Sequence, residues 1–286
     1  MREFDRDTIT DAVLERFADT PDPRLRQIMQ SLTRHLHDFA RDVDLTIEDW
    51  DAAIGFLTRT GHMCDDRRQE FILLSDTLGL SMLVDAINHP PEAGTTATTV
   101  LGPFYVADPP VRDRGTDISG GAAGEPLFID GQVTDADGSP VPGAWVDVWQ
   151  SDDDGYYDVQ KPGQEPELRA RFIADDAGRF DLWSIVPSSY PIPDDGPVGD
   201  MLRATARHPW RPAHVHFMIG APGFRTLVTH LFVEGDRYLE TDAVFGVKES
   251  LVVSMGEDGP GPGPEGKVLD RPWKVIAHRF GLTRAA

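Results

Sequence analysis

The chain has 286 residues, of which 40% are hydrophobic and 26% charged, proportions typical of a folded globular protein. Its formal net charge of −21 at pH 7 argues against binding to nucleic acid and to anionic membrane surfaces, because both attract basic patches. A single cysteine, Cys64, excludes an intrachain disulfide and suits a reducing cytoplasm, where we expect the protein. No apolar run approaches the ~18 residues of a membrane span, and residues 1–7 are too charged for a signal peptide.

The first 90 or so residues have the apolar periodicity of helices. In chain order, we expect helices at residues 8–17, 23–43, from 46 onward, 65–79 and 80–88. Thr46-Ile47-Glu48-Asp49 resembles a capping box, and Pro90-Pro91 ends the helical part. The apolar stripes exceed what a bundle of this size needs. We therefore expect them to pack on the second half of the chain, on a partner subunit, or on both.

From about Phe128 the pattern changes to short strands separated by turn signals such as Asp137-Gly138. The strand candidates are residues 144–149, 169–173, 180–185, 226–233, 250–255 and 274–279. Many short strands with such punctuation indicate a β-sandwich or a barrel. We predict an α+β fold, with a helical domain at residues 1–95 and a β-rich domain at residues 96–286.

Two histidines lie two residues apart in the apolar run from Arg211 to Ile219. The β-branched and aromatic residues of this run are typical of a strand, in which side chains at i and i+2 leave the same face. Neutral imidazoles are common ligands of transition metals, so His214 and His216 form half of a possible metal site. The alternative is a pair of buried histidines bonded to the backbone, and the motif alone leaves both interpretations open.

His35 and His37 have the same spacing but lie in a segment with helical periodicity. Positions i and i+2 of a helix are about 200° apart around its axis, because a turn takes 3.6 residues. These two imidazoles cannot bind one ion, and we interpret them as helix-surface residues.

Two tyrosines follow predicted strands at positions suited to a site. Tyr157 comes soon after the strand at 144–149, and Tyr190 lies in a segment restricted by several prolines. A phenolate is a hard, strongly donating anion that suits Fe(III) better than Zn(II). Taken singly, each residue is more often an ordinary core or surface tyrosine.

Taken together, these motifs resemble the intradiol ring-cleavage dioxygenases. The family's pattern occurs in order as Gly155-Tyr156-Tyr157, Pro187-Ser188-Ser189-Tyr190 and Arg211-Pro212-Ala213-His214-Val215-His216-Phe217. The resemblance runs from the N-terminal helices to near the C-terminus.

Within the family the chain is most similar to the hydroxyquinol 1,2-dioxygenases. The residues that indicate this branch are Asp158-Val159-Gln160, the run from Tyr190 to Gly199, Leu227-Val228-Thr229-His230 and the run from Asp242 to Lys248. Catechol and chlorocatechol enzymes usually carry Gln where His230 stands. The chain departs from the family pattern at Tyr156, where Phe is common, and at Arg237, where Pro is common.

The resemblance implies one non-haem Fe(III) per subunit, held by Tyr157, Tyr190, His214 and His216. It also implies that Tyr190 leaves the metal and takes a proton when substrate binds, and that Arg211 stabilises developing negative charge. An ordinary salt bridge is the alternative for Arg211. The implied fold is a helical domain that forms a homodimer, often around a phospholipid, followed by a β-sandwich catalytic domain.

The implied reaction uses O2 to open the ring of hydroxyquinol, an aromatic triol, to 3-hydroxy-cis,cis-muconate, a precursor of maleylacetate. A catechol or chlorocatechol dioxygenase on the same scaffold is the nearest alternative. A β-sandwich carrier of an aromatic ligand, with an incidental metal, is an alternative of another class. A zinc hydrolase fits less well, because a set of two tyrosines and two histidines lacks the carboxylate or thiolate usual for zinc.

The resemblance places the substrate pocket at Leu73, Asp76, Val100, Leu101, Gly102, Pro103, Phe104, Ile192, Pro193, Arg211 and Val244. Asp76 lies between Leu73 and Leu80, on a helix face expected to be apolar, where a carboxylate needs a partner. Our hypothesis is that it binds the third hydroxyl of hydroxyquinol. A buried cap or ion pair is the alternative.

Overall fold

The computed structural model describes residues 3–65, 68–161 and 166–285. The chain divides into two compact units, Met1–Arg59 and Thr60–Ala286. The functional domain boundary expected after residue 95 is a separate matter from these compact units and stays a prediction. No helix in the described segments is long and apolar enough to cross a membrane.

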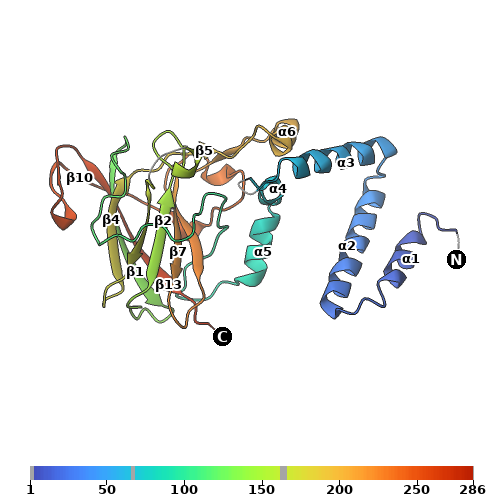
Figure 1. Ribbon diagram of the computed structural model, residues 1–286, viewed down its shortest axis with the longest axis horizontal. Coiled ribbons are helices and arrows are strands. Elements are labelled where there is room, and N and C mark those ends of the chain that lie inside the picture. Colours follow the sequence, from blue (N-terminus) through green and yellow to red (C-terminus); the bar gives the residue numbers. More distant parts are fainter. Residues whose placement is uncertain (1–2, 66–67, 162–165, 286) are drawn as a thin grey trace. The chain divides into compact units, whose positions relative to one another are not determined.

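The first unit consists of α1 (Ile9–Arg16), α2 (Pro23–Asp42) and most of α3 (Ile47–His62), shown in blue in Figure 1. The expected capping box is confirmed, because Asp49 N–H donates to Thr46 Oγ1 at 3.1 Å and Thr46 N–H donates to Asp49 Oδ2 at 3.2 Å. His35 and His37 lie on α2, as expected, and His37 Nδ1 bonds to Thr10 Oγ1 at 3.0 Å.

α2 and α3 each carry a row of exposed apolar side chains. These side chains recur at helical spacing, which makes them a stripe rather than scattered exceptions. They are Leu25, Ile28, Leu32, Leu36, Phe39 and Val43 along α2, and Ile47, Trp50, Ile54 and Leu57 along α3. Exposed apolar rows of this kind are typical of interaction sites.

The second unit begins with short helices and continues into the sheets. α4 (Glu70–Thr77) and α5 (Leu80–Asn88) are joined by Gly79, whose φ of 72° is left-handed. The helix expected at 65–79 is shorter than predicted, and its residues 66 and 67 lie outside the described part of the chain. α4 packs against α6 (Pro197–Ala204).

Two main sheets form the predicted β-sandwich (Figure 1). Among the described residues, one sheet has the order β10-β13-β1-β4 and the other has the order β3-β2-β7-β8-β9. The strands are β1 (Pro126–Asp135), β2 (Trp145–Gln150), β3 (Arg169–Ile173), β4 (Arg179–Ile185), β7 (His214–Gly220), β8 (Leu227–Val233), β9 (Val252–Val253), β10 (Gly256–Asp258) and β13 (Trp273–Leu282). Two small pairs, β5 (Tyr190–Pro191) with β6 (Trp210–Arg211) and β11 (Gly261–Pro262) with β12 (Val268–Leu269), complete the β structure. The α+β prediction is confirmed.

The segment 250–255, expected to be a strand, pairs only at β9, because Glu249–Leu251 forms a 3-10 turn. The core between the sheets is built from inward-facing residues of both layers, including Ile129, Val148, Phe172, Leu182, Phe217 and Phe280, all with 0% exposure. Burying so much apolar surface is the main stabilisation of the sandwich.

Strand register positions the candidate site on the outer face of the five-stranded sheet. Val215, Phe217 and Ile219 of β7 face the core, so the alternating His214 and His216 face the opposite side. His216 is opposite Trp149 on one neighbouring strand and opposite His230 on the other.

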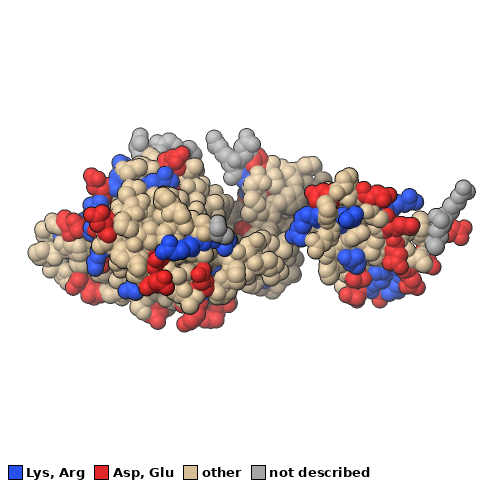
Figure 2. Space-filling view, turned by 90° about the horizontal axis from the view of Figure 1, so that it is seen from below, with Lys and Arg blue, Asp and Glu red and all other residues tan. Residues whose placement is uncertain are grey.

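Figure 2 shows the charged side chains on one face of the molecule. On the face shown in Figure 2, the visible Lys and Arg side chains of the described residues lie in small groups among Asp and Glu. Wide areas of this face carry neither kind of charge.

Candidate metal centre and adjoining cavity

Four donor atoms form a closed ring. Tyr157 Oη lies 2.9 Å from His216 Nε2, which lies 3.1 Å from His214 Nε2. Tyr190 Oη closes the ring, at 3.5 Å from His214 Nε2 and 3.3 Å from Tyr157 Oη. The structure therefore brings together the four residues that the sequence suggested as ligands, although their binding of iron stays a proposal.

Local structure holds the two tyrosines in place. Gly155 has a φ of 85°, and a Cβ there would lie 2.9 Å from Tyr190 Cβ, so only glycine lets the two segments approach. Tyr157 N–H donates to Gln160 Oε1 at 2.8 Å. Tyr190 pairs with Arg211 between β5 and β6, which places its phenol beside the guanidinium.

The hydrogen bonds of His214 define its tautomer. Its Nδ1 lies 2.7 Å from the carbonyl oxygen of Pro212, which can only accept, so Nδ1 carries the proton. The Nε2 lone pair then points into the donor ring. Burial and the charge of Arg211 lower the pKa of His214 to about 3, which keeps the imidazole neutral at pH 7.

Burial and the nearby imidazoles likewise hold the pKa of His216 well below its ordinary value. Burial raises the pKa of Tyr157 well above its ordinary value, and the neighbouring Tyr190 adds to this effect. Without a bound cation, the site therefore favours the neutral forms of His214, His216 and Tyr157.

The ring has the size that a metal ion requires. Two donors each about 2.1 Å from one ion lie about 3.0 Å apart at a right angle and about 3.6 Å apart at 120°. The four observed edges, between 2.9 and 3.5 Å, lie within or next to this range. Neutral imidazole nitrogen and phenolic oxygen are both suitable donors for ferric iron.

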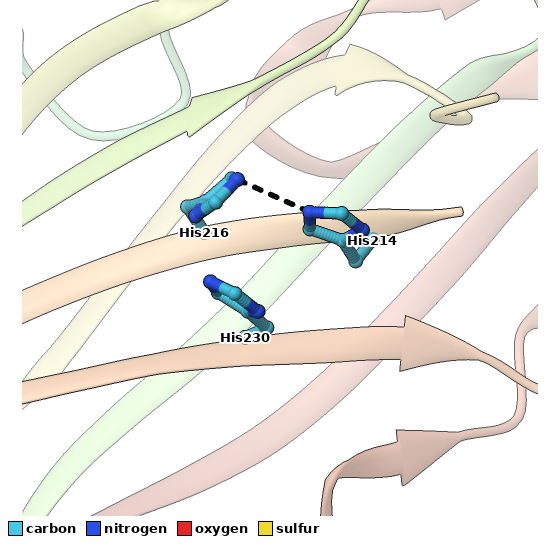
Figure 3. A group of neighbouring side chains, drawn as sticks. All are labelled: His214, His216 and His230. Carbon is cyan, nitrogen blue, oxygen red and sulfur yellow. Dashed lines mark hydrogen bonds between the residues drawn. The ribbon is translucent and has the colours of Figure 1, made fainter. Parts of the chain in front are cut away.

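A third imidazole, His230 of β8, lies beside the two histidines of β7 (Figure 3). Nitrogen atoms of the three rings lie within 4.8 Å of one another. The His230 ring stacks on His214 at 4.8 Å and meets His216 edge-to-face at 4.1 Å. The sequence indicated His230 only as a marker of the family branch, because its proximity depends on the pairing of β7 with β8.

Aromatic packing restricts the rings of the site. Trp149 stacks on His216 at 4.7 Å with an interplanar angle of 15°. Phe104 stacks on Tyr157 at 4.4 Å with an interplanar angle of 23°. Such contacts limit ring rotation and exclude water.

Arg211 lies beside the ring and is 3% exposed. Its Nη1 lies 3.5 Å from Tyr190 Oη and 3.3 Å from His214 Nε2, while Nε and Nη2 pair with Asp242. Burial alone would lower the pKa of Arg211, but Asp242 and Tyr190 raise it above its ordinary value. The residue is thus in a salt bridge and also directs a permanent positive charge at the site.

A cavity of about 620 Å³ adjoins the donor ring. Eight of the predicted substrate residues line it: Leu73, Asp76, Val100, Leu101, Gly102, Pro103, Phe104 and Pro193. Phe104 also stacks on Tyr157, and a Cβ added to Gly102 would lie 3.3 Å from His216 Cε1, so this wall reaches the ring.

The other predicted pocket residues lie elsewhere in the same unit. Ile192 and Val244 pack with Leu73 in a buried apolar cluster, and Arg211 lies at the donor ring. Lining residues that the sequence did not single out include Arg68, Glu70, Ser81, Asp85 and Thr99. Their position depends on how α4 and α5 pack over the 99–104 segment, which no local pattern specifies.

Asp76 is 6% exposed and lines the cavity. Burial raises its pKa, although a hydrogen bond with Ser81 and the charge of Arg211 act in the opposite direction. The helix face is less apolar than expected, because α4 ends at Thr77 and Leu80 is 53% exposed on α5.

Two family models of known proteins match this chain. A family model described as the catechol dioxygenase N terminus matches residues 22–96, and a dioxygenase model matches residues 100–270. The chain belongs to the intradiol ring-cleavage dioxygenase family. This membership implies non-haem iron, and the imidazoles described above provide nitrogen donors for a metal.

Relatives of this dioxygenase resemble it over most of their length. It is 57% identical to 6-chlorohydroxyquinol 1,2-dioxygenase of Cupriavidus pinatubonensis, covering 88% of this chain and 92% of the relative. It is 52% identical to hydroxyquinol 1,2-dioxygenase of Nocardioides simplex, with coverage of 97% and 94%. The crystal structure of hydroxyquinol 1,2-dioxygenase from Pseudomonas putida superimposes with a TM-score of 0.92 at 49% identity, covering 98% of this chain and 99% of that one.

Proposed function

We propose that this dioxygenase cleaves hydroxyquinol between its two adjacent hydroxyl-bearing carbons. Both atoms of O2 enter the product, 3-hydroxy-cis,cis-muconate, which leads to maleylacetate. The observation that carries the proposal is the ring of four donor atoms beside a charged arginine and a cavity of about 620 Å³. The hydroxyquinol dioxygenases that share about half of its sequence support the choice of substrate.

We assign Tyr157, Tyr190, His214 and His216 as ligands of one Fe(III) per subunit. When bound, ferric iron supplies a Lewis acid that favours the doubly deprotonated form of an aromatic diol. Two phenolic oxygens support Fe(III) as the preferred metal. His230 lies outside the proposed ligand set, because the phenolic oxygens already complete a closed ring with His214 and His216.

Tyr190 and Arg211 are the proposed catalytic residues. Tyr190 Oη accepts a proton from a substrate hydroxyl, which helps the substrate to bind as a dianion. Arg211 Nη1, 3.5 Å from that oxygen, stabilises the phenolate before the transfer and the developing negative charge of the substrate afterwards. A guanidinium suits this role because it stays charged at all relevant pH values.

We propose that Asp76 recognises the third hydroxyl of hydroxyquinol. Its carboxylate lines the cavity and bonds with the Ser81 hydroxyl, which leaves acceptor capacity for a substrate hydroxyl. Catechol lacks this hydroxyl and would leave the buried group without that partner. A site built to bond a substrate hydroxyl disfavours the analogue that lacks it.

Oxygen uptake by the iron-loaded protein tests the function. Hydroxyquinol and catechol are compared at equal concentrations, and we expect much faster uptake with hydroxyquinol. Equal or faster uptake with catechol would keep the family chemistry but favour a catechol or chlorocatechol dioxygenase. Binding of both compounds without oxygen uptake would instead favour a carrier of aromatic ligands.

We further propose that residues 1–95 serve dimerisation and that residues 96–286 form the catalytic domain of a cytoplasmic homodimer. The exposed apolar stripe of α2 and α3 supports an interface between two copies, with a phospholipid as a possible occupant. Light scattering gives the subunit number, and mass spectrometry of an organic extract identifies any bound lipid. The single cysteine suits the reducing cytoplasm.

A further inference from the structure

The carboxylate of Asp242 binds the side of the Arg211 guanidinium that faces away from the donor ring. Arg211 Nε lies 3.0 Å from Asp242 Oδ1, and Nη2 lies 3.3 Å from Oδ2. Both side chains are at most 3% exposed, so water competes little for either partner. This two-point contact fixes the plane of the guanidinium and leaves Nη1 directed toward Tyr190 and His214.

The same carboxylate organises the turn that follows it. Asp242 Oδ1 accepts from Val244 N–H at 3.3 Å, and Oδ2 accepts from Gly246 N–H at 2.9 Å. Phe245 N–H donates to the Asp242 carbonyl at 3.1 Å, which closes the turn. These bonds fix the orientation of the Asp242 carboxylate, and its two contacts with Arg211 then fix the orientation of the guanidinium.

Packing around the guanidinium leaves little freedom. A Cβ added to Gly246 would lie 2.9 Å from Arg211 Nη2 and 3.2 Å from Asp242 Oδ2. Real Cβ contacts are almost never shorter than 3.0 Å, so the guanidinium would have to move. The backbone of Gly246 does not have a positive φ, so alanine there is not strained by its conformation.

We propose that Asp242 is a positioning residue that acts through Arg211, directing Nη1 at the donor ring. This inference rests on the proposed function of the site. It predicts that loss of Asp242 lowers turnover while substrate binding persists, because the uncompensated arginine still attracts an anionic substrate.

The first test compares Asp242→Asn with the wild-type iron-loaded enzyme. We expect kcat with hydroxyquinol to fall by about 10- to 100-fold, the scale of a misplaced catalytic group, with KM unchanged or lower. The visible tyrosinate-to-iron band should shift at unchanged iron content, because Arg211 lies 3.5 Å from Tyr190 Oη.

Asp181→Asn is the matched control, since Asp181 is a buried carboxylate paired with Arg114 in the other sheet. Its kcat per bound iron and its visible band should match the wild type. A raised KM with unchanged kcat in Asp242→Asn, or an unshifted band at wild-type kcat, would overturn the proposal.

Gly246→Ala provides a second route if Asp242→Asn folds poorly. It displaces the guanidinium without changing any charge, and we expect a smaller fall in kcat with KM preserved. Wild-type kcat in this variant would count against the need for a fixed guanidinium. If the wild-type enzyme consumes oxygen with neither substrate, the proposed function itself is refuted, and the inference about Asp242 is refuted with it.

Discussion

Substrate choice is expected to depend on Asp76. Replacing it by alanine removes the proposed hydrogen bond between a buried carboxylate and the third hydroxyl of hydroxyquinol. A hydrogen bond to a charged group contributes about 1.5–3 kcal/mol, which corresponds to about a 12- to 150-fold change in kcat/KM. Asp76 is 6% exposed, so water replaces the lost contact poorly, and we expect the upper part of this range.

Initial rates of oxygen uptake with hydroxyquinol and catechol measure this effect in Asp76→Ala. We expect kcat/KM for hydroxyquinol to fall as calculated, while the value for catechol changes by less than about threefold. Asp76→Asn keeps an acceptor atom and should give an intermediate loss. An unchanged hydroxyquinol-to-catechol ratio in Asp76→Ala would refute the recognition hypothesis.

Asp85→Asn is the matched control, because Asp85 lines the same cavity but already has three partners. Its carboxylate bonds to Thr98 Oγ1 at 2.9 Å, His89 Nδ1 at 2.8 Å and Lys248 Nζ at 3.1 Å. We expect this variant to lose stability without a change in the substrate ratio.

Three further predictions concern the metal, the pH dependence and the assembly. Tyr157→Phe should lose most of the visible tyrosinate-to-iron absorption band. His230→Gln should keep both the band and the bound iron, as measured by absorption and metal analysis. The reverse pattern would contradict the ligand assignment. Burial lowers the pKa of His278 from 6.5 to about 4. Between pH 6.5 and pH 4, His278 is therefore protonated in the unfolded chain and neutral in the folded chain. The free energy of unfolding should therefore fall by up to about 3 kcal/mol from pH 6.5 to 4 in denaturant titrations, and His278→Gln should remove that part of the slope. Leu32→Glu, in the exposed stripe of α2, should yield monomers by light scattering, and an unchanged mass would place the interface elsewhere.

Local sequence patterns specified much of the fold. Two histidine pairs have the same spacing, but helical periodicity predicted one pair on a helix and β-branched residues predicted the other on a strand. The structure places the first pair on α2 and the second on β7, as expected. The reason is that side-chain direction follows directly from local backbone geometry. The four proposed ligands were found by their motifs, and the structure brings their donor atoms within 3.5 Å of neighbours in one ring.

The features that escaped prediction depend on long-range packing. Asp242 follows Arg211 by 31 residues, and its contact with the guanidinium depends on how the turn at 242–246 folds back over β6. His230 reaches His216 through strand register, which a local pattern does not specify. The helix expected at 65–79 was overestimated mainly at its start, because α4 begins at Glu70, whereas its last residue, Thr77, lies close to the predicted end.

The most direct test of the account is to supply the iron-loaded enzyme with hydroxyquinol and isotopically labelled O2, and to identify the product by mass spectrometry. We predict one ring-opened product, 3-hydroxy-cis,cis-muconate, that carries both labelled oxygen atoms. A ring-intact product, an unlabelled product, or cleavage outside the bond between the two hydroxyl-bearing carbons would contradict the central claim.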